Sequence, residues 1–234
     1  MNNQNSDPIV QLNNACKTYQ QGKIEVKAVD HFSLDIQRGD FAALCGPSGS
    51  GKTSVLNLIG GLDLPTSGEV WVDQINLATL SASALSNMRK NRIGFVFQSY
   101  NLIPVMTAYE NAEFVLTLQG VNKAESHERV MDILHDVGLD GLEHRRPDEM
   151  SGGQQQRVAI ARAIVTEPAI ILADEPTANV DSHTANSLLD LMQKLNQEKG
   201  MTFLFSTHDQ NVMNRARRLI RLRDGKLEED ELRR

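Results

Sequence analysis

The sequence has few cysteines, few aromatic residues and no long hydrophobic run. Its 234 residues include only two cysteines, which have neither the spacing of a metal-binding motif nor the number needed for a disulfide framework. So low a cysteine content is typical of a reducing compartment. No segment approaches the ~20 apolar residues of a transmembrane helix, and residues 1–8 lack the charged and apolar regions of a signal peptide. We expect a chain that does not cross a membrane.

A concentrated positive charge is also missing. The formal net charge is −6, with 24 Lys and Arg against 30 Asp and Glu. Binding to duplex nucleic acid normally needs a dense basic face. We therefore expect no nucleic-acid partner. The two basic clusters, residues 89–92 and 215–223, are interpreted as solvated helix faces.

Residues 46–53, GPSGSGKT, match the phosphate-binding pattern GxxxxGK[ST] at every fixed position. They lie between a short apolar strand and an apolar helix. Glycines let several N–H groups point at a phosphate, Lys52 adds a positive charge, and Thr53 offers a hydroxyl to Mg²⁺. An isolated match also fits an ordinary Gly/Ser turn, so the other motifs decide. The predicted nucleotide-binding residues here are Gly46, Pro47, Ser48, Gly49, Ser50, Gly51, Lys52, Thr53 and Ser54.

A second motif is the apolar run of residues 169–173, which ends in Asp174 and Glu175. The run is typical of a central parallel strand. Successive strand residues point to opposite sides, so the two carboxylates have different tasks. Asp174 suits Mg²⁺, and Glu175 suits a water aligned on the γ-phosphate. Alone, the pattern also fits a solvated strand end.

A third motif, residues 151–157 (SGGQQQR), opens a helix, and Ser151 with Gln154 forms a capping box. Alone it would indicate only a well-capped helix. Between the two other motifs, it resembles the signature sequence of the ATP-binding cassette (ABC) ATPases, usually LSGGQ, with Met150 in place of Leu. We call residues 151–157 the signature segment.

The resemblance extends to four further positions in the expected order. It implies that Tyr19 stacks on adenine and that Gln98 senses Mg²⁺ and a membrane partner. It also implies that Asp181 crosses to a partner subunit and that His208 contacts the γ-phosphate. Taken alone, a tyrosine is usually a packing residue, a glutamine is usually solvated, and a histidine more often has a structural role than a catalytic one. The order Thr53-Ser54 and the residue Val180 depart from the commoner family pattern, and Val180 leaves the cross-subunit contact open.

The fold that the resemblance implies is α/β: a P-loop NTPase of the ABC ATPase type, with a RecA-like parallel core, an antiparallel β layer and an inserted helical subdomain. We expect one ABC ATPase domain over residues 1–234, with the helical subdomain at approximately 105–150 continuing into the signature helix. The expected antiparallel strands are residues 9–13, 29–36 and 69–72, and the expected parallel strands are 41–45, 93–97, 170–173 and 202–206. Apolar stripes in 130–137 and 188–195 predict amphipathic helices, and Asp224-Gly225 predicts a hairpin turn.

The mechanism that the resemblance implies uses ATP and Mg²⁺ in a head-to-tail homodimer. Each ATP would lie between the phosphate loop of one chain and the signature segment of the other. The implied catalytic residues are Glu175 and His208, and the implied metal ligands are Thr53, Gln98 and Asp174. The implied contacts across the dimer come from Ser151, Gly152, Gly153, Gln154 and Asp181.

Residues 94–104, 107–111 and 151–162 look like the branch of lipoprotein-release, macrolide-exporter and antimicrobial-peptide-resistance ATPases. The branch implies a separate integral membrane subunit and a peripheral place on the cytoplasmic face of the inner or plasma membrane. One alternative is a regulatory cassette that controls a cell-envelope hydrolase through a membrane subunit. A soluble DNA-repair or ribosome-acting ATPase would need a long coiled coil or two cassettes, and a sugar importer would usually have a further β-domain. The transported substrate and the direction of transport would depend on the partner.

Overall fold

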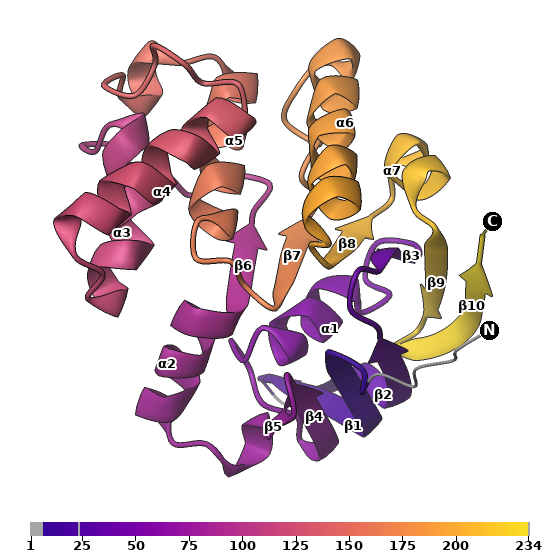
Figure 1. The fold of residues 1–234 in the computed structure, drawn as a ribbon. Helices are drawn as coiled ribbons and strands as arrows, with labels where there is room; N and C mark the ends of the chain where they lie inside the picture. The colour runs from indigo at the N-terminus through magenta and orange to yellow at the C-terminus, as the bar shows by residue number, and fades with distance from the viewer. Residues whose placement is uncertain (1–6, 23, 234) are drawn as a thin grey trace, which may run out of the picture.

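The computed structural model describes residues 7–22 and 24–233, and it arranges them in two sheets with helices on both sides (Figure 1). Residues 1–6 lie outside the described residues, and they belong to the stretch that we expected to lack a signal peptide. Residues 23 and 234 of the expected domain also lie outside the described residues. One sheet is antiparallel, with the order β2 (Ile24–Ile36), β1 (Val10–Gln21), β4 (Ser67–Val72) and β5 (Ile75–Asn76). The other has the order β10 (Lys226–Leu232), β9 (Arg218–Arg223), β3 (Phe41–Cys45), β8 (Phe203–Thr207), β7 (Ile170–Asp174) and β6 (Ile93–Val96).

The second sheet is parallel from β9 to β6, and only β10 runs antiparallel to its neighbour. Strands β3, β6, β7 and β8 are buried on both faces, which is why they read as continuous apolar runs. In β3, Phe41 and Ala43 pack into one core cluster, and Ala42 and Leu44 pack into the other. The predicted RecA-like parallel core and antiparallel layer are therefore confirmed.

The helices divide between the two core clusters. Helix α1 (Lys52–Ile59) lies between the two sheets, and α2 (Ala82–Arg92) precedes β6 (Figure 1). Helices α3 (Ala108–Gln119), α4 (Lys123–Asp136) and α5 (Gly152–Ile164) lie together beyond β6, while α6 (Ser182–Lys199) and α7 (Gln210–Arg215) cover the sheet. Short 3₁₀ helices span Leu77–Thr79 and Pro147–Glu149. None of the helices described has the length and apolar character needed to span a bilayer.

The first two strands are longer than the sequence predicted. After Leu12, the pairing of β1 with β2 shifts register three times, and Asn14 and His31 adopt φ values of 52° and 49°. These bulges interrupt the alternation of apolar and polar residues by which a strand is recognised. The alternating hydrophobic pattern is therefore lost in parts of β1 and β2 that are still strand.

The interpretation of residues 215–223 as a solvated helix face is wrong for most of the segment. Residues 218–223 form β9, and its arginines pair with acidic residues of β10, as in Arg218–Asp230 (2.7 Å) and Arg221–Glu229 (2.8 Å). The turn between the two strands is the predicted one, with φ values of 49° at Asp224 and 76° at Gly225. These cross-strand pairs neutralise the positive charge of the arginines in this basic cluster.

Candidate nucleotide-binding and catalytic site

Three motifs that lie far apart in the sequence meet at the carboxyl ends of neighbouring parallel strands. The phosphate loop, residues 46–53, follows β3, Asp174 ends β7, Glu175 comes directly after it, and His208 follows β8. Because β3, β8 and β7 are adjacent, these residues share one edge of the sheet. This edge is where ligands bind in open α/β sheets.

Two glycines of the phosphate loop are required by its close contact with other strands. Gly46 has φ 155° and Gly51 has φ 102°, both unfavourable for other residues. A Cβ atom would lie 2.2 Å from the Leu222 carbonyl oxygen at Gly46, and 2.3 Å from the Ala28 carbonyl oxygen at Gly51. The loop is therefore pressed onto β9 and β2, and its curled path is fixed.

The loop presents donors suited to an anion. The Lys52 side chain is almost buried, and its ammonium donates to the carbonyl oxygens of Gly46 (2.8 Å) and Pro47 (3.0 Å). Gly51 is the N-cap residue of α1 and offers no side-chain cap, and the buried Ser50 hydroxyl has no hydrogen-bond partner within residues 7–22 and 24–233. Uncapped N–H groups at a helix start favour phosphate. These residues fit a nucleotide polyphosphate.

Thr53 and Asp174 are brought together as a pair of oxygen ligands. The Thr53 hydroxyl lies 3.3 and 3.5 Å from the two carboxylate oxygens of Asp174. Hydroxyl and carboxylate oxygens suit Mg²⁺, which also keeps waters and phosphate oxygens. Gln98, the third expected ligand, is exposed, and its backbone carbonyl accepts from Asn179 Nδ2 at 2.9 Å. Its side chain forms no hydrogen bond with Thr53 or Asp174 in the described structure.

Glu175 is held by two neighbours at the end of β8. Its Oε1 lies 2.6 Å from His208 Nδ1, and its Oε2 accepts from the Thr207 hydroxyl at 3.2 Å. The carboxylate is thereby oriented toward the shared edge. Sequence reasoning missed Thr207; a hydroxyl residue that ends an apolar strand just before a candidate histidine was the available signal.

Tyr19 reaches the site from β1. The Lys17 ammonium lies 5.1 Å from the centre of the Tyr19 ring, and it also pairs with Asp63 at 2.5 Å. Partial burial raises the pKa of the Tyr19 hydroxyl, beside which lie Ser54 and Asp63. The structure therefore places the expected adenine-stacking residue next to the first turn of α1.

The signature segment and Asp181 act as helix caps within this chain. The Ser151 hydroxyl accepts from Gln154 N at 3.3 Å, and Ser151 N donates to Gln154 Oε1 at 2.9 Å, which confirms the capping box. Asp181 caps α6 by accepting from the backbone N–H groups of His183 and Thr184, a role that sequence reasoning missed. Bonds from Thr184 lower the pKa of Asp181. In the described chain, no hydrogen bond connects Ser151, Gly152, Gly153, Gln154 or Asp181 to the phosphate loop.

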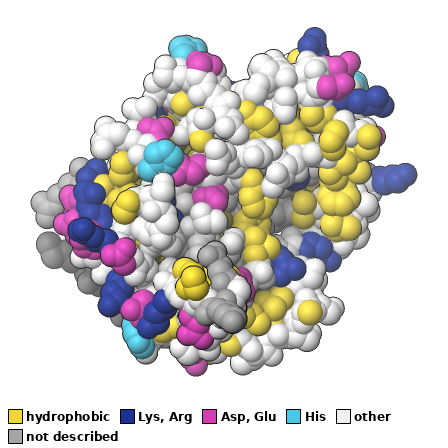
Figure 2. Space-filling view, turned by 180° about the vertical axis from the view of Figure 1, so that it is seen from behind, with side chains coloured by type: hydrophobic (Ala, Val, Ile, Leu, Met, Phe, Trp, Pro, Cys, Tyr) yellow, Lys and Arg dark blue, Asp and Glu magenta, His cyan; other side chains and the backbone are white. Residues whose placement is uncertain are grey.

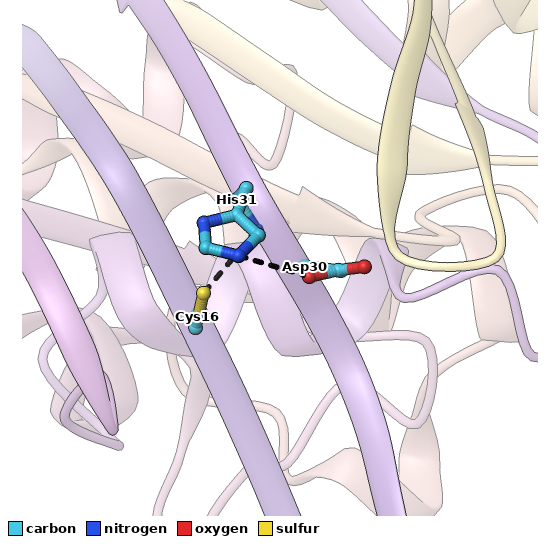
Figure 3. A group of neighbouring side chains, drawn as sticks. All are labelled: Cys16, Asp30 and His31. Carbon is cyan, nitrogen blue, oxygen red and sulfur yellow. Dashed lines mark hydrogen bonds and ion pairs between the residues drawn. The ribbon is translucent and has the colours of Figure 1, made fainter.

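A cysteine that the sequence left without a role lies beside an acidic residue and a histidine. Cys16 on β1 faces Asp30 and His31 on β2, with their ligand atoms within 4.8 Å of one another (Figure 3). Asp30 already pairs with the ammonium groups of Lys27 (2.5 Å) and Lys226 (3.3 Å). Any cation would have to displace both, so the three residues are better described as part of an ion-pair cluster.

Comparison with known proteins places this geometry in a family. The family model described as ABC transporter matches residues 29–178. The chain is 44% identical to the uncharacterized ABC transporter ATP-binding protein MJ0796 of Methanocaldococcus jannaschii over 227 residues, covering 95% of this chain and 97% of that protein. It is also 44% identical to the uncharacterized ABC transporter ATP-binding protein YvrO of Bacillus subtilis over 220 residues, covering 94% and 96%.

Solved structures agree with these matches. The dimeric post-hydrolysis state of the ATP-binding cassette MJ0796, bound to ADP and Pi, superposes with a TM-score of 0.88 at 44% identity, covering 96% of this chain and 99% of that one. The structure of cbiO1 from Clostridium perfringens, part of the ABC transporter complex cbiONQ, gives 0.87 at 26% identity, covering 97% and 89%. With the phosphate loop, paired carboxylates and capped signature helix in the same fold, this chain belongs to the ABC transporter family as an ATP-binding subunit.

Proposed function

We propose that this chain hydrolyses ATP to power a separate membrane subunit, through ATP-driven closure of a homodimer. The observation that carries this proposal is the meeting of Lys52, the Thr53–Asp174 pair and the Glu175–His208 pair at one edge of the parallel sheet. The relative MJ0796 has been captured after hydrolysis with ADP and Pi bound, which supports the same reaction here.

Each residue of the site has its own role in the proposed hydrolysis of ATP. Lys52 and the N–H groups of the phosphate loop hold the β- and γ-phosphates. Thr53 and Asp174, with Gln98, would hold Mg²⁺, which would neutralise phosphate charge when bound. Glu175 takes the proton of the attacking water. Since His208 Nδ1 is engaged by Glu175, its Nε2 is the nitrogen left for a phosphate oxygen.

One chain supplies only part of each site. Ser151, Gly152, Gly153, Gln154 and Asp181 make no hydrogen bond with the phosphate loop in the described chain, and they lie around the starts of α5 and α6. The uncapped start of α1 and the signature start of α5 both favour negative charge. In a head-to-tail homodimer, ATP would lie between the start of α1 in one chain and the start of α5 in the other. The dimeric structures of the MJ0796 cassette support the formation of such a dimer. ATP binding then closes the dimer, and hydrolysis releases it.

The membrane subunit is proposed to dock in an apolar groove between β6, α3 and α5. This groove has a volume of about 290 Å³ and is lined by Phe95, Phe97 and Phe114, among others. The first two rings stack with centroids 5.4 Å apart. Viewed from behind, hydrophobic side chains gather on the half of the surface where α2 to α5 lie (Figure 2). The cbiO1 cassette is itself part of a transporter complex.

We propose accordingly that residues 1–234 work as one domain, with the helical subdomain of about 105–150 as its docking arm. The chain would lie on the cytoplasmic face of the inner or plasma membrane. Among membrane partners, we favour those of the lipoprotein-release and macrolide-export branch, because residues 94–104 and 151–162 resemble that branch. The same mechanics would serve a regulatory cassette for a cell-envelope hydrolase. The membrane protein that co-purifies with this chain would distinguish the two.

We expect Val105→Asp to abolish co-purification with the membrane subunit while sparing ATP binding. Val105 is 75% exposed in the segment between β6 and α3, a segment whose Asn101 lines the groove, so a carboxylate there changes the surface without disturbing the core. Burying that charge at an apolar interface without a counter-ion is costly. Leu102→Asp should have the same effect, but Leu102 packs against the core, so its folding must be checked by circular dichroism. Leu232→Asp, at an equally exposed residue of β10, is the control; unchanged co-purification of Val105→Asp would place the docking surface elsewhere.

We expect Thr53→Val to raise the Mg²⁺ concentration needed for half-maximal ATP hydrolysis by about 10- to 100-fold, a loss that even an outer-shell partner of a metal site produces when it is removed. The substitution keeps the shape and removes the hydroxyl that lies beside Asp174. A Mg²⁺ titration of phosphate release measures it. Thr117→Val, at an exposed position of α3, is the matched control. Overlapping titrations of Thr53→Val and the wild type would remove Thr53 from the metal site.

A further inference from the structure

Gln156 is a buried polar side chain of α5 to which the sequence assigned no role. It has no exposed surface, and its Nε2 donates a 2.7 Å hydrogen bond to the carbonyl oxygen of Pro176, the residue after Glu175. Its Oε1 has no hydrogen-bond partner among the residues described. Burying an amide with one atom unpaired costs free energy, so such a residue calls for a reason other than stability.

The bonded carbonyl belongs to a strained turn. We call residues 175–179 the catalytic turn. Glu175 has φ 45°, a conformation that non-glycine residues keep only when their surroundings hold them there. The Thr177 hydroxyl is held by Asp209 at 3.2 Å, and Asn179 by the Gln98 carbonyl at 2.9 Å. Gln156 is the residue of α5 that holds this turn.

The start of α5 also packs tightly against the surroundings of the turn. A Cβ atom on Gly152 would lie 2.8 Å from the Tyr100 hydroxyl, which itself donates to the Asn179 carbonyl at 3.1 Å. A Cβ atom on Gly153 would lie 2.4 Å from Thr184 Cγ2. Gln156 is one helical turn beyond Gly152 and so lies on the same face of α5. The signature segment cannot shift without affecting the catalytic turn.

We propose that Gln156 is a positioning residue that couples the two ATP sites of the dimer. This inference rests on the proposed function, in which the signature segment of a chain contacts the nucleotide of its partner while Glu175 serves the nucleotide of its own chain. A nucleotide held at Ser151 fixes the position of α5. The bond from Gln156 to Pro176 then fixes the backbone that orients Glu175. Hydrolysis at one site therefore depends on occupancy of the other.

The first test is Gln156→Met, which keeps the length of the side chain and removes the amide donor. We expect kcat to fall about 10- to 100-fold, the cost of a small misplacement of a catalytic group, with ATP affinity unchanged. The Hill coefficient for ATP should fall from a wild-type value above 1 to about 1, because the two sites no longer act together. Gln119→Met is the matched control, since it removes a similar 3.0 Å bond from Nε2 to the Lys90 carbonyl far from the turn.

The second test is Gln156→Glu, which also covers the case in which Gln156→Met does not fold. A protonated Glu can donate to the Pro176 carbonyl, and an ionised one cannot. Burial raises the pKa of a carboxyl group, so the ratio of mutant to wild-type kcat should rise as pH is lowered through that pKa. A wild-type kcat and Hill coefficient in Gln156→Met, or a ratio for Gln156→Glu that does not change with pH, would overturn the inference. A wild-type protein that neither hydrolyses ATP nor dimerises with it would contradict the proposed function instead.

Discussion

Replacing Glu175 with Gln is expected to slow ATP hydrolysis by about 10²- to 10⁴-fold, the usual contribution of a positioned general base. The amide keeps the shape of the side chain, and its oxygen can still accept the bond from the Thr207 hydroxyl. It cannot take a proton from water. ATP binding should therefore survive, and because hydrolysis reopens the proposed dimer, the variant should accumulate as an ATP-bound dimer. Phosphate release and gel filtration with ATP measure the two effects.

Glu198→Gln is a suitable control for this experiment. Glu198 is an exposed residue of α6 that pairs weakly with Lys194 at 3.9 Å, so its loss changes the charge by the same amount away from the site. The control should hydrolyse ATP at the wild-type rate and show no excess of dimer. If Glu175→Gln also turned over at the wild-type rate, another residue would position the attacking water.

The sequence was sufficient for the part of the site that depends on short-range geometry. The spacing of residues 46–53 predicts a loop between β3 and α1 because the conformation of this one short loop determines where glycine and lysine are needed. The apolar run before Asp174 predicts β7 because a strand buried on both faces needs apolar residues throughout. The capping box of Ser151 was predictable for the same reason, because its partner Gln154 lies three residues away. Asp181 caps α6 at an equally short range, and that role was missed.

The contacts that complete the site join segments far apart in the chain, and no local pattern encodes them. Thr207 and His208 reach Glu175 across more than thirty residues because β7 and β8 are neighbours, and the order of strands is a property of the whole sheet. Gln156 looks like a polar residue on a helix until the fold places it against Pro176. The β1–β2 extension was missed because bulges at Asn14 and His31 break its periodicity.

Replacing Lys52 with Ala is expected to raise the Kd for ATP by about 10- to 100-fold. A charge-assisted hydrogen bond contributes about 1.5–3 kcal/mol, and each 1.4 kcal/mol is a factor of ten in affinity. The Lys52 ammonium lies over the loop, held by the carbonyl oxygens of Gly46 and Pro47, so it is already in place for the phosphates. Calorimetry with ATP measures the change in affinity directly.

The thermal shift of the same variant separates binding from folding. A ligand that binds only the folded state stabilises it by RT ln(1 + [L]/Kd), so a weaker Kd must reduce the rise in Tm that ATP produces. Without nucleotide, the Tm should change little, because the backbone carbonyls of Gly46 and Pro47 lie in a half-exposed to exposed loop where water can replace the ammonium. Lys194→Ala, an exposed position on α6, should keep both the affinity and the full shift. An ATP affinity in Lys52→Ala equal to that of the wild type would mean that the N–H groups of the loop and the start of α1 hold the phosphates without help from this cation.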